Sequence, residues 1–236
     1  MEIVRNGFAL LTTFAVTLIW LRVCDFAAHR GWISSDLSRK IIHMGTGPLF
    51  VLCWLLYTDT PYARYLAALV PLMITLQFIL VGLGKVRDEA AVRAMSRTGD
   101  PREILRGPLY YGVIFVLLTI IYWKESPIGI VALMLMCGGD GLADILGRRW
   151  GKVKLPWNKG KSWIGSLGMF AGGWIFAYII LGIFTFSGVF LNPLTSYLLA
   201  LTIISLAGTA VESLPFKDID NITVTTTAVV LGHFLF

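Results

Sequence analysis

Long apolar segments, separated by short polar connections, make up most of this chain of 236 residues. Several segments reach the roughly 17–25 apolar residues that a helix needs to cross the hydrocarbon core of a bilayer. The alternation of apolar and polar residues that a membrane β-barrel requires is absent, and a helix satisfies its own backbone hydrogen bonds in lipid. The pattern therefore predicts an all-α polytopic transmembrane bundle in one domain covering 1–236. The candidate spans, seven or eight in number because the first and last are short, lie at about 7–21, 41–57, 65–84, 108–123, 127–146, 162–184, 191–214 and 222–236.

The composition favours a membrane protein over a soluble one. Hydrophobic residues make up 56% of the chain and charged residues only 14%, whereas soluble domains carry about 25% charged residues. Cys24, Cys53 and Cys137 each stand alone in or beside an apolar run, so neither a disulfide framework nor a zinc site is indicated. The first apolar stretch runs into Arg22 without a clean small-residue cleavage site. We interpret it as a retained span rather than a signal peptide.

The positive charges are distributed unequally between the connections. Of the 20 Lys and Arg residues, 17 fall in the connections after the first, third, fifth and seventh spans, and the other three are Arg5, Arg64 and Lys124. Cytoplasmic loops carry the excess of Lys and Arg, so these connections are predicted to face the cytoplasm and both termini the other side. Much of this charge is explained by topology and by anionic headgroups, which attract each cation by about 1 kcal/mol.

Acidic residues gather at the same predicted membrane face. Asp140, Asp144, Glu212, Asp218 and Asp220 lie at the cytoplasmic ends of the fifth, seventh and eighth spans. Acids and cations together at one membrane surface suit a site for a metal ion and phosphate.

Asp140 and Asp144 are the most unusual of these acids. In a helix that starts near Pro127 they lie about 20 and 26 Å along its axis, against a hydrocarbon core of about 30 Å. An ionised carboxylate at a helix centre costs about 2.5–3.5 kcal/mol to insert, and less towards the edge, so it needs a partner or a function. Two carboxylates one turn apart share a face and can bind Mg²⁺, with phosphate and water completing the shell. The structural alternative is an ion pair with Arg148 or Arg149.

Gly147 and Gly151 continue the stripe formed by these two acids. They could let a nucleotide approach the backbone closely, or they could form a small-xxx-small seam that packs against another helix. The sequence leaves both interpretations open.

The connection after the fifth span is basic and ends in a helix start. Ser162 is a candidate cap of the sixth span, and free N–H groups beside its hydroxyl and Lys161 would form an anion site. The stretch does not satisfy the GxxxxGK[ST] spacing of a phosphate-binding P-loop. The alternative to an anion site is an ordinary capped helix that follows a basic loop whose charge only sets the membrane topology. Asp100, Pro101 and Glu103 form a similar helix start, which we assign to folding.

Two further stretches place polar residues on this face. Arg39, Lys40 and His43 stand at the start of the second span, with Arg39 and His43 one turn apart. Glu212 ends the seventh span and Asp220 opens the eighth, where an Asp could also be a simple N-cap.

Taken together, these residues resemble the CTP-dependent polyprenol and lipid kinases, and most closely the phytol kinase branch. The family also contains farnesol kinase, dolichol kinase and the CTP-dependent diacylglycerol kinase. The resemblance covers about residues 39–224, and the stretch 138–173 is its most specific part. Its pieces are RKIIHMG (39–45), LRGPLYYG (105–112), GGDGLADILGRRWGKVKLP (138–156), KSWIGSLGMFAGG (161–173) and VESLPFKDIDNITV (211–224).

The resemblance implies an integral membrane kinase. Such an enzyme transfers the γ-phosphate of CTP to the hydroxyl of a long-chain isoprenoid alcohol, such as phytol or geranylgeraniol, with Mg²⁺, and releases CDP. Its partners are CTP, the alcohol and membrane lipid rather than nucleic acid, and its oligomeric state is open. The resemblance implies a bacterial (cyanobacterial-like) or plastid membrane, with the site facing the cytoplasm or stroma.

On this hypothesis the candidate site residues take distinct roles. The alcohol proton goes to His43 or to one of the acids, and the sequence does not choose between them. Asp140 and Lys161 are the further catalytic candidates. The metal candidates are Asp140, Asp144, Glu212 and Asp220. The nucleotide candidates are Arg148, Lys154, Asn158, Lys161, Ser162, Gly165 and Ser166. Further phosphate or substrate contacts are Arg39, Lys40 and Arg106.

Two other functions compete with this hypothesis. Phosphatidate cytidylyltransferases, which make a CDP-lipid from a lipid phosphate and CTP, share an acidic-glycine helix and a K[ST]WEG-like stretch. Here Ile164 replaces the usual Glu and the C-terminal HGGxxDR segment is missing, which favours the kinases. A transporter or channel would need acids at several depths, whereas the acids here lie near one surface.

Overall fold

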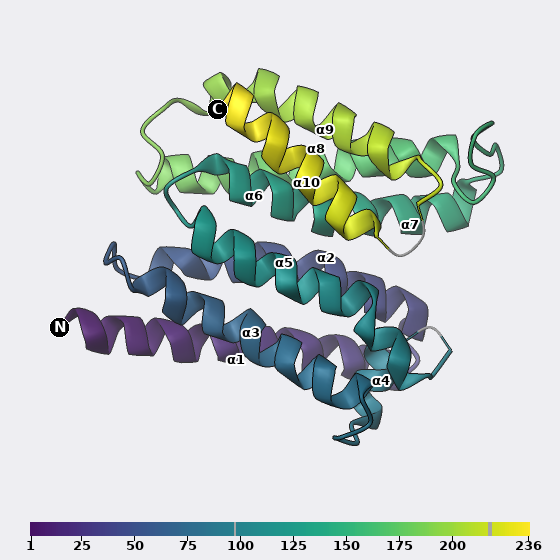
Figure 1. The fold of residues 1–236 in the computed structure, drawn as a ribbon, viewed down its shortest axis with the longest axis horizontal. Helices are drawn as coiled ribbons and strands as arrows, with labels where there is room; N and C mark the ends of the chain where they lie inside the picture. The colour runs from purple at the N-terminus through teal and green to yellow at the C-terminus, as the bar shows by residue number, and fades with distance from the viewer. Residues whose placement is uncertain (97, 217–218) are drawn as a thin grey trace. The chain divides into compact units, whose positions relative to one another are not determined.

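The computed structural model describes residues 1–96, 98–216 and 219–236. The chain divides into two compact units, Met1–Ile121 and Tyr122–Phe236, which are described separately. Both units consist of helices (Figure 1), and no strand forms among the described residues beyond the isolated bridge between Lys154 and Ser162. This confirms the predicted all-α class. The single kinase domain over 1–236 stays a prediction.

In the unit Met1–Ile121, the long helices pack against one another in two pairs. Helix α1 packs against α2 and α3 packs against α5. Gly112 on α5 lies so close to α3 that a Cβ there would come within 2.2 Å of the Thr75 hydroxyl oxygen. The elements are α1 (Glu2–His29), α2 (Ser35–Cys53), η1 (Trp54–Leu56), α3 (Ala63–Gly82), α4 (Glu89–Met95), η2 (Pro101–Leu105) and α5 (Gly107–Ile121). The predicted helix start at Asp100 is confirmed, because its side chain accepts a hydrogen bond from the Arg102 amide at the beginning of η2.

The unit Tyr122–Phe236 is built around one long buried segment. This segment runs through α6 (Pro127–Met134), the π-helical turn η3 (Leu135–Gly139) and α7 (Asp140–Trp150). The remaining elements are α8 (Trp163–Phe186), η4 (Leu194–Tyr197), α9 (Leu198–Glu212) and α10 (Asp220–Leu235). Helix α9 packs against both α8 and α10 (Figure 1), and α8 contacts both α7 and η3. The predicted span over 127–146 is therefore helical but not one regular α-helix.

Glycines allow the close packing of α8 against η3. A Cβ on Gly172 would lie 2.3 Å from the carbonyl oxygen of Gly138, which is backbone and cannot rotate away. Leu135, fully buried in η3, fills the space next to Gly173 of α8 and Gly208 of α9. The π-turn is thus held between two neighbouring helices in the core of this unit.

All eight predicted spans correspond to helical segments, and within the described residues six helices are long and apolar enough to cross a membrane. Helices α2 and α10 are not among these six within the described residues, and the number of spans and the side of the N-terminus stay predictions. The six are Glu2–His29, Ala63–Gly82, Pro101–Ile121, Pro127–Trp150, Trp163–Phe186 and Leu194–Glu212.

Candidate functional site

Three carboxylates converge at one end of the unit Tyr122–Phe236. Asp140 is the first residue of α7, Glu212 the last residue of α9 and Asp220 the first residue of α10. One ligand oxygen from each lies within 4.8 Å of the others. The structure therefore brings together three of the four acids that the sequence suggested as metal ligands. We call Asp140, Glu212 and Asp220 the carboxylate cluster.

The π-turn determines where Asp140 points. It ends at Gly139, directly before Asp140, and its five residues are all buried. A π-turn accommodates one extra residue and so rotates the next helical segment by about 100° relative to a regular α-helix. The direction of Asp140 could not be obtained by counting regular turns from Pro127. The consecutive glycines Gly138 and Gly139 are the sequence signal that could have indicated this irregularity.

Lys161 provides the positive charge within the carboxylate cluster. Its Nζ donates to Glu212 Oε1 and, at 3.2 Å, to Asp220 Oδ2. Burial lowers the pKa of Lys161, but the nearby Glu212, Asp220 and Asp140 raise it by more, and the net pKa lies above its ordinary value. Lys161 is therefore an ammonium at neutral pH and the natural counter-ion of these acids.

Glu212 retains one unsatisfied oxygen. Its side chain is only 3% exposed, and Oε2 has no hydrogen-bond partner among the described residues. A buried anionic oxygen without a partner is energetically costly, because it has lost its hydration. The three converging carboxylate oxygens, one of them without a hydrogen-bond partner among the described residues, form a set of ligands that suits a divalent cation.

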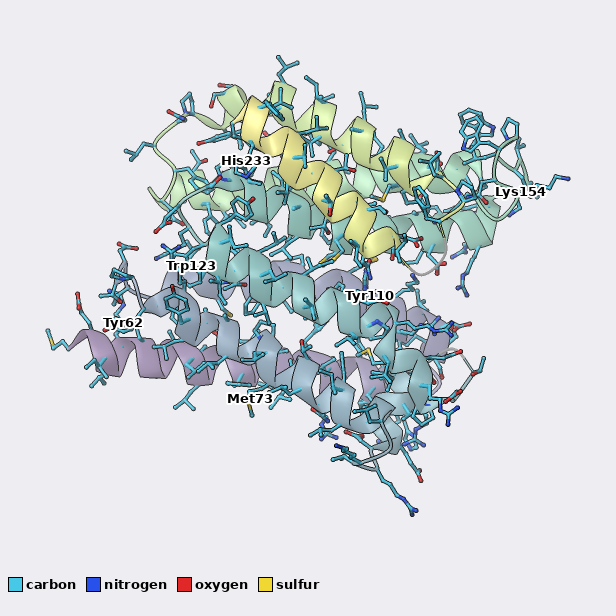
Figure 2. All side chains as sticks on the ribbon, viewed as in Figure 1. Tyr62, Met73, Tyr110, Trp123, Lys154 and His233 are labelled. Atoms are coloured by element: carbon cyan, nitrogen blue, oxygen red, sulfur yellow. The ribbon has the colours of Figure 1, made fainter. Side chains whose placement is uncertain are left out.

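A tight loop delivers Lys161 to this position. The bridge between Lys154 and Ser162 closes the loop between α7 and α8, and the Trp163 amide donates to the Val153 carbonyl at 3.2 Å. The Leu155 side chain is buried beneath the loop at 1% exposure. Lys154 itself is exposed, and Figure 2 labels it in this loop.

The start of α8 packs against α7. Ser162 caps α8 as predicted, because its Oγ accepts a hydrogen bond from the Gly165 amide at 3.2 Å. A Cβ on Gly165 would lie 3.2 Å from the Ala143 carbonyl and 3.4 Å from Gly147 Cα. Two of the predicted nucleotide contacts, Ser162 and Gly165, therefore lie in a helix contact. Ser166 Oγ is buried without a hydrogen-bond partner among the described residues.

The two glycines on α7 belong to the same contact. A Cβ on Gly151 would come within 2.3 Å of Ser162 Oγ, and one on Gly147 would meet Gly165 Cα at 3.5 Å. Of the two interpretations that the sequence left open for these glycines, the structure supports the helix-packing seam.

Asp144 has a different environment from Asp140. Its Oδ1 accepts a hydrogen bond from Arg148 Nε at 2.9 Å, an ion pair one turn along α7. Asp144 is not part of the carboxylate cluster. The ion pair that the sequence analysis gave as the structural alternative is thus formed, and it also engages Arg148, a predicted nucleotide contact. Asp218, another acid noted from the sequence, lies outside the described residues.

Asn158 is occupied by protein contacts. Its Nδ2 donates to the carbonyls of Ser213 and Leu214, both at 3.1 Å, directly after α9. The neighbouring Trp157 donates from Nε1 to Ser213 Oγ at 3.2 Å. The sequence suggested Asn158 as a nucleotide contact and did not single out Trp157. Nothing in its sequence context signals a bond to residues more than fifty positions away.

The predicted site residues of the first helices lie in the unit Met1–Ile121. Arg39 donates to the Ser96 carbonyl at 3.1 Å and to Asp36 at 3.2 Å. The His43 ring packs on the Tyr111 ring with centroids 4.5 Å apart, and the Tyr111 hydroxyl donates to the His43 carbonyl at 2.8 Å. Lys40 is partly buried and Arg106 is exposed. The joint action of these four residues with the carboxylate cluster stays a prediction.

Curated relatives match almost the whole chain. A probable chloroplastic phytol kinase of Triticum aestivum is 39% identical over 236 residues, covering 99% of this chain and 79% of the relative. A chloroplastic farnesol kinase of Arabidopsis thaliana is 41% identical over 237 residues, covering 100% and 76%. A probable chloroplastic phytol kinase of Oryza sativa subsp. japonica is 42% identical over 229 residues, covering 96% and 72%. No family model matches the chain, and no solved structure matches it.

Proposed function

This chain belongs to the family of phytol and farnesol kinases, and from that membership we propose that it transfers the γ-phosphate of CTP to a long-chain isoprenoid alcohol. It is an alcohol phosphotransferase whose acceptor is an isoprenoid alcohol. Phytol or geranylgeraniol as the acceptor, CTP as the donor and Mg²⁺ as the cofactor are the finer parts of the proposal. The structural observation that supports phosphoryl transfer with a metal ion is the convergence of Asp140, Glu212 and Asp220 with Lys161.

The carboxylate cluster fits Mg²⁺ in its chemistry. Hard divalent cations prefer oxygen ligands, and Mg²⁺ in phosphate-binding sites takes one or two carboxylates together with phosphate oxygens and water. The partnerless Oε2 of Glu212 supports a cation at this place, because a bound ion would satisfy it. Asp140, Glu212 and Asp220 would hold the ion, which would neutralise charge on the phosphates of the donor.

The protein contributes mainly charge and position. In the reaction the alcohol oxygen forms a bond to the γ-phosphorus, the bond to the β-phosphate oxygen breaks, and the alcohol proton passes to a base. Phosphoryl transfer depends largely on alignment and on stabilising the charge of the phosphoryl oxygens. Lys161, held at the cluster, would contact these oxygens, and Lys154 and Arg148 would add positive charge nearby. His43 or a cluster carboxylate would accept the proton.

The membrane placement follows from the amphiphilic substrate. A long-chain alcohol keeps its hydroxyl near the headgroup boundary, so it would approach the cluster sideways from the leaflet while CTP arrives from the aqueous side. The excess of Lys and Arg in the odd-numbered connections supports a site facing the cytoplasm or stroma. The chloroplastic relatives support a plastid-type or cyanobacterial-type membrane.

The test is a transfer assay with purified full-length protein, Mg²⁺, γ-labelled CTP and either phytol or geranylgeraniol. We expect labelled prenyl monophosphate and CDP. Asp140→Asn should lower kcat by about a hundredfold to a thousandfold, since it removes a charged ligand of the ion that stabilises the transition state. Glu125→Gln, which removes an acid at the other end of the α6–α7 segment, is the matched control and should retain activity.

Two outcomes would contradict the proposal. Full activity of Asp140→Asn would exclude the metal role of the cluster. Pyrophosphate and a CDP-lipid as products, separated by chromatography, would instead identify a cytidylyltransferase.

A further inference from the structure

We propose that Asn158 is a positioning residue that holds Lys161 against Glu212, and that it does not contact the nucleotide. This inference rests on the proposed function, because it assigns a task within the same site. It differs from the nucleotide contact that the sequence suggested for Asn158.

The side-chain amide of Asn158 has no donor left for a ligand. An asparagine amide carries two N–H donors and one carbonyl acceptor. The donors are taken by the carbonyls of Ser213 and Leu214, and Oδ1 accepts from the Gly160 amide at 3.1 Å. Two carbonyl partners at one end and an N–H partner at the other also fix the orientation of the amide.

Asn158 is hydrogen-bonded to Lys161 and to the residue that follows Glu212. On one side, the Lys161 amide donates to the Asn158 carbonyl at 3.0 Å, and the Leu155 amide donates to the Lys161 carbonyl at 3.1 Å. These bonds and the buried Leu155 side chain make the loop a rigid carrier for Lys161. On the other side, Asn158 binds the carbonyl of Ser213, the residue that follows Glu212. Lys161 and Glu212 are 51 positions apart, and Asn158 connects their two segments through its backbone carbonyl on one side and its side chain on the other.

Trp157 adds a second bond between the same two segments. Its Nε1 donates to Ser213 Oγ, and that hydroxyl in turn donates to the Ala210 carbonyl at 2.6 Å within α9. Trp157 as a residue is 51% exposed, so its hydrogen bond rather than its burial ties it to α9. We call Trp157 and Asn158 the α9 bracket.

The α9 bracket positions Glu212 and Lys161 of the site without itself contacting the carboxylates. Groups that orient metal ligands without touching the ion typically change metal affinity or activity by about 10–100-fold when removed. Loss of the bracket should therefore weaken the metal site and slow turnover, and among the proposed nucleotide contacts it should disturb only the contact of Lys161 with the phosphoryl oxygens.

Asn158→Asp tests this with the smallest possible change. It keeps the size of the side chain and the Oδ1 acceptor, but puts a charged oxygen opposite two carbonyls. Trp157→Phe removes one N–H donor and keeps an aromatic ring. Val153→Ala, at a residue of the same loop that is 67% exposed, is the matched control.

Three measurements on the full-length protein separate positioning from nucleotide binding. Mn²⁺ affinity is measured by electron paramagnetic resonance of the free ion, without nucleotide or alcohol. Amide hydrogen exchange of residues 209–214 is followed by mass spectrometry. Kinetics give kcat and the KM for CTP.

For Asn158→Asp we expect Mn²⁺ affinity and kcat to fall about tenfold or more, exchange in 209–214 to accelerate, and KM for CTP to change less than about threefold. Trp157→Phe should shift the same quantities in the same direction by a smaller factor, which keeps the proposal testable if Asn158→Asp does not fold. Val153→Ala should match the wild type.

A rise in KM with unchanged Mn²⁺ affinity would overturn the proposal and make Asn158 a nucleotide contact. Unchanged exchange in 209–214 in both variants would overturn it as well. A wild-type protein that binds no Mn²⁺ and forms no prenyl monophosphate would contradict the proposed function instead. The exchange measurement still tests the α9 bracket in that case, because it needs neither metal nor substrate.

Discussion

Lys161 acts as an internal cation for three acids that would otherwise repel one another. Its Nζ contacts Glu212 and Asp220, and Asp140 lies within the same cluster. Removing one partner of a buried ion pair leaves an uncompensated charge and costs about 3–5 kcal/mol. A bound divalent cation can take over part of this compensation, so the stabilisation by Lys161 depends on the metal.

Lys161→Met should therefore lower the free energy of unfolding by about 3 kcal/mol when divalent cations are chelated. The loss should shrink when Mg²⁺ is added, because the ion then balances the acids. Thermal unfolding in detergent, with chelator and with Mg²⁺, measures both values. An equal loss in the two conditions would show that no ion compensates for Lys161.

The pH dependence of this contribution has a defined sign. The pKa of Lys161 is raised above its ordinary value of 10.5 by the three acids, against the opposing effect of burial. A group whose pKa is raised by folding stabilises fully below its unfolded pKa and loses that effect as pH rises through its folded pKa. The difference in melting temperature between wild type and Lys161→Met should stay constant from about pH 7 to pH 9 and decrease only above pH 10.5. A decrease already between pH 7 and pH 9 would contradict the raised pKa of Lys161.

At the scale of single residues, the sequence predicts which side chains gather at this end of the spans but not how they pair. Asp140 and Asp144 look equivalent in the sequence, one turn apart on the same segment. The structure separates them, because Asp144 has a cation one turn ahead of it in Arg148 and Asp140 has none at that distance. Asp140 instead meets acids from two other helices, and such contacts depend on tertiary packing that no local pattern encodes.

At the scale of elements, the packing of η3 against α8 determines where Asp140 lies. The π-turn precedes Asp140, and its close contact with α8 depends on Gly138 and Gly172. A side chain at this contact would push α8 away from the segment that bears Asp140. Small residues here thus connect helix packing to the geometry of the carboxylate cluster.

Gly172→Ala should be strongly damaging. The added Cβ would lie 2.3 Å from the Gly138 carbonyl oxygen, so the backbones of α8 and η3 must separate. Overpacking of this kind costs about 1–3 kcal/mol, and we expect kcat to fall as Asp140 is displaced. Gly182→Ala is the control on the same helix, because its Cβ would meet only Leu194 Cδ2 at an ordinary 3.4 Å. Thermal unfolding and turnover of the two variants should differ clearly, and equal behaviour would contradict this account of the seam.

Hydropathy and helix-capping residues predicted most elements well, since both are local properties of the sequence. Each predicted span is helical, and Ser162 caps α8 as its position before an apolar run indicated. The π-turn escaped prediction because the apolar pattern of 127–139 is the same whichever hydrogen-bond ladder the backbone adopts. The α9 bracket escaped it because Asn158 and Ser213 lie far apart along the chain.

At the scale of the whole molecule, charge and hydropathy address different questions. Among the described residues, hydropathy identifies six helices long and apolar enough to cross a membrane. It does not select α2, whose first turns carry Asp36, Arg39 and Lys40. The distribution of Lys and Arg instead addresses orientation. Because 17 of the 20 fall in alternate connections, the orientation prediction depends on every predicted span being counted, α2 and α10 included.

Cysteine labelling tests that orientation. Lys159→Cys places a thiol in the loop between α7 and α8, and Lys124→Cys places one in the connection between α5 and α6. In sealed vesicles whose cytoplasmic or stromal side faces inward, a membrane-impermeant maleimide should label Lys124→Cys at once and Lys159→Cys only after permeabilisation. The unaltered chain is the background control, because Cys24, Cys53 and Cys137 are all buried. The reverse pattern would place the carboxylate cluster on the other side of the membrane, and labelling of both positions from one side would mean that the segment between them does not span it.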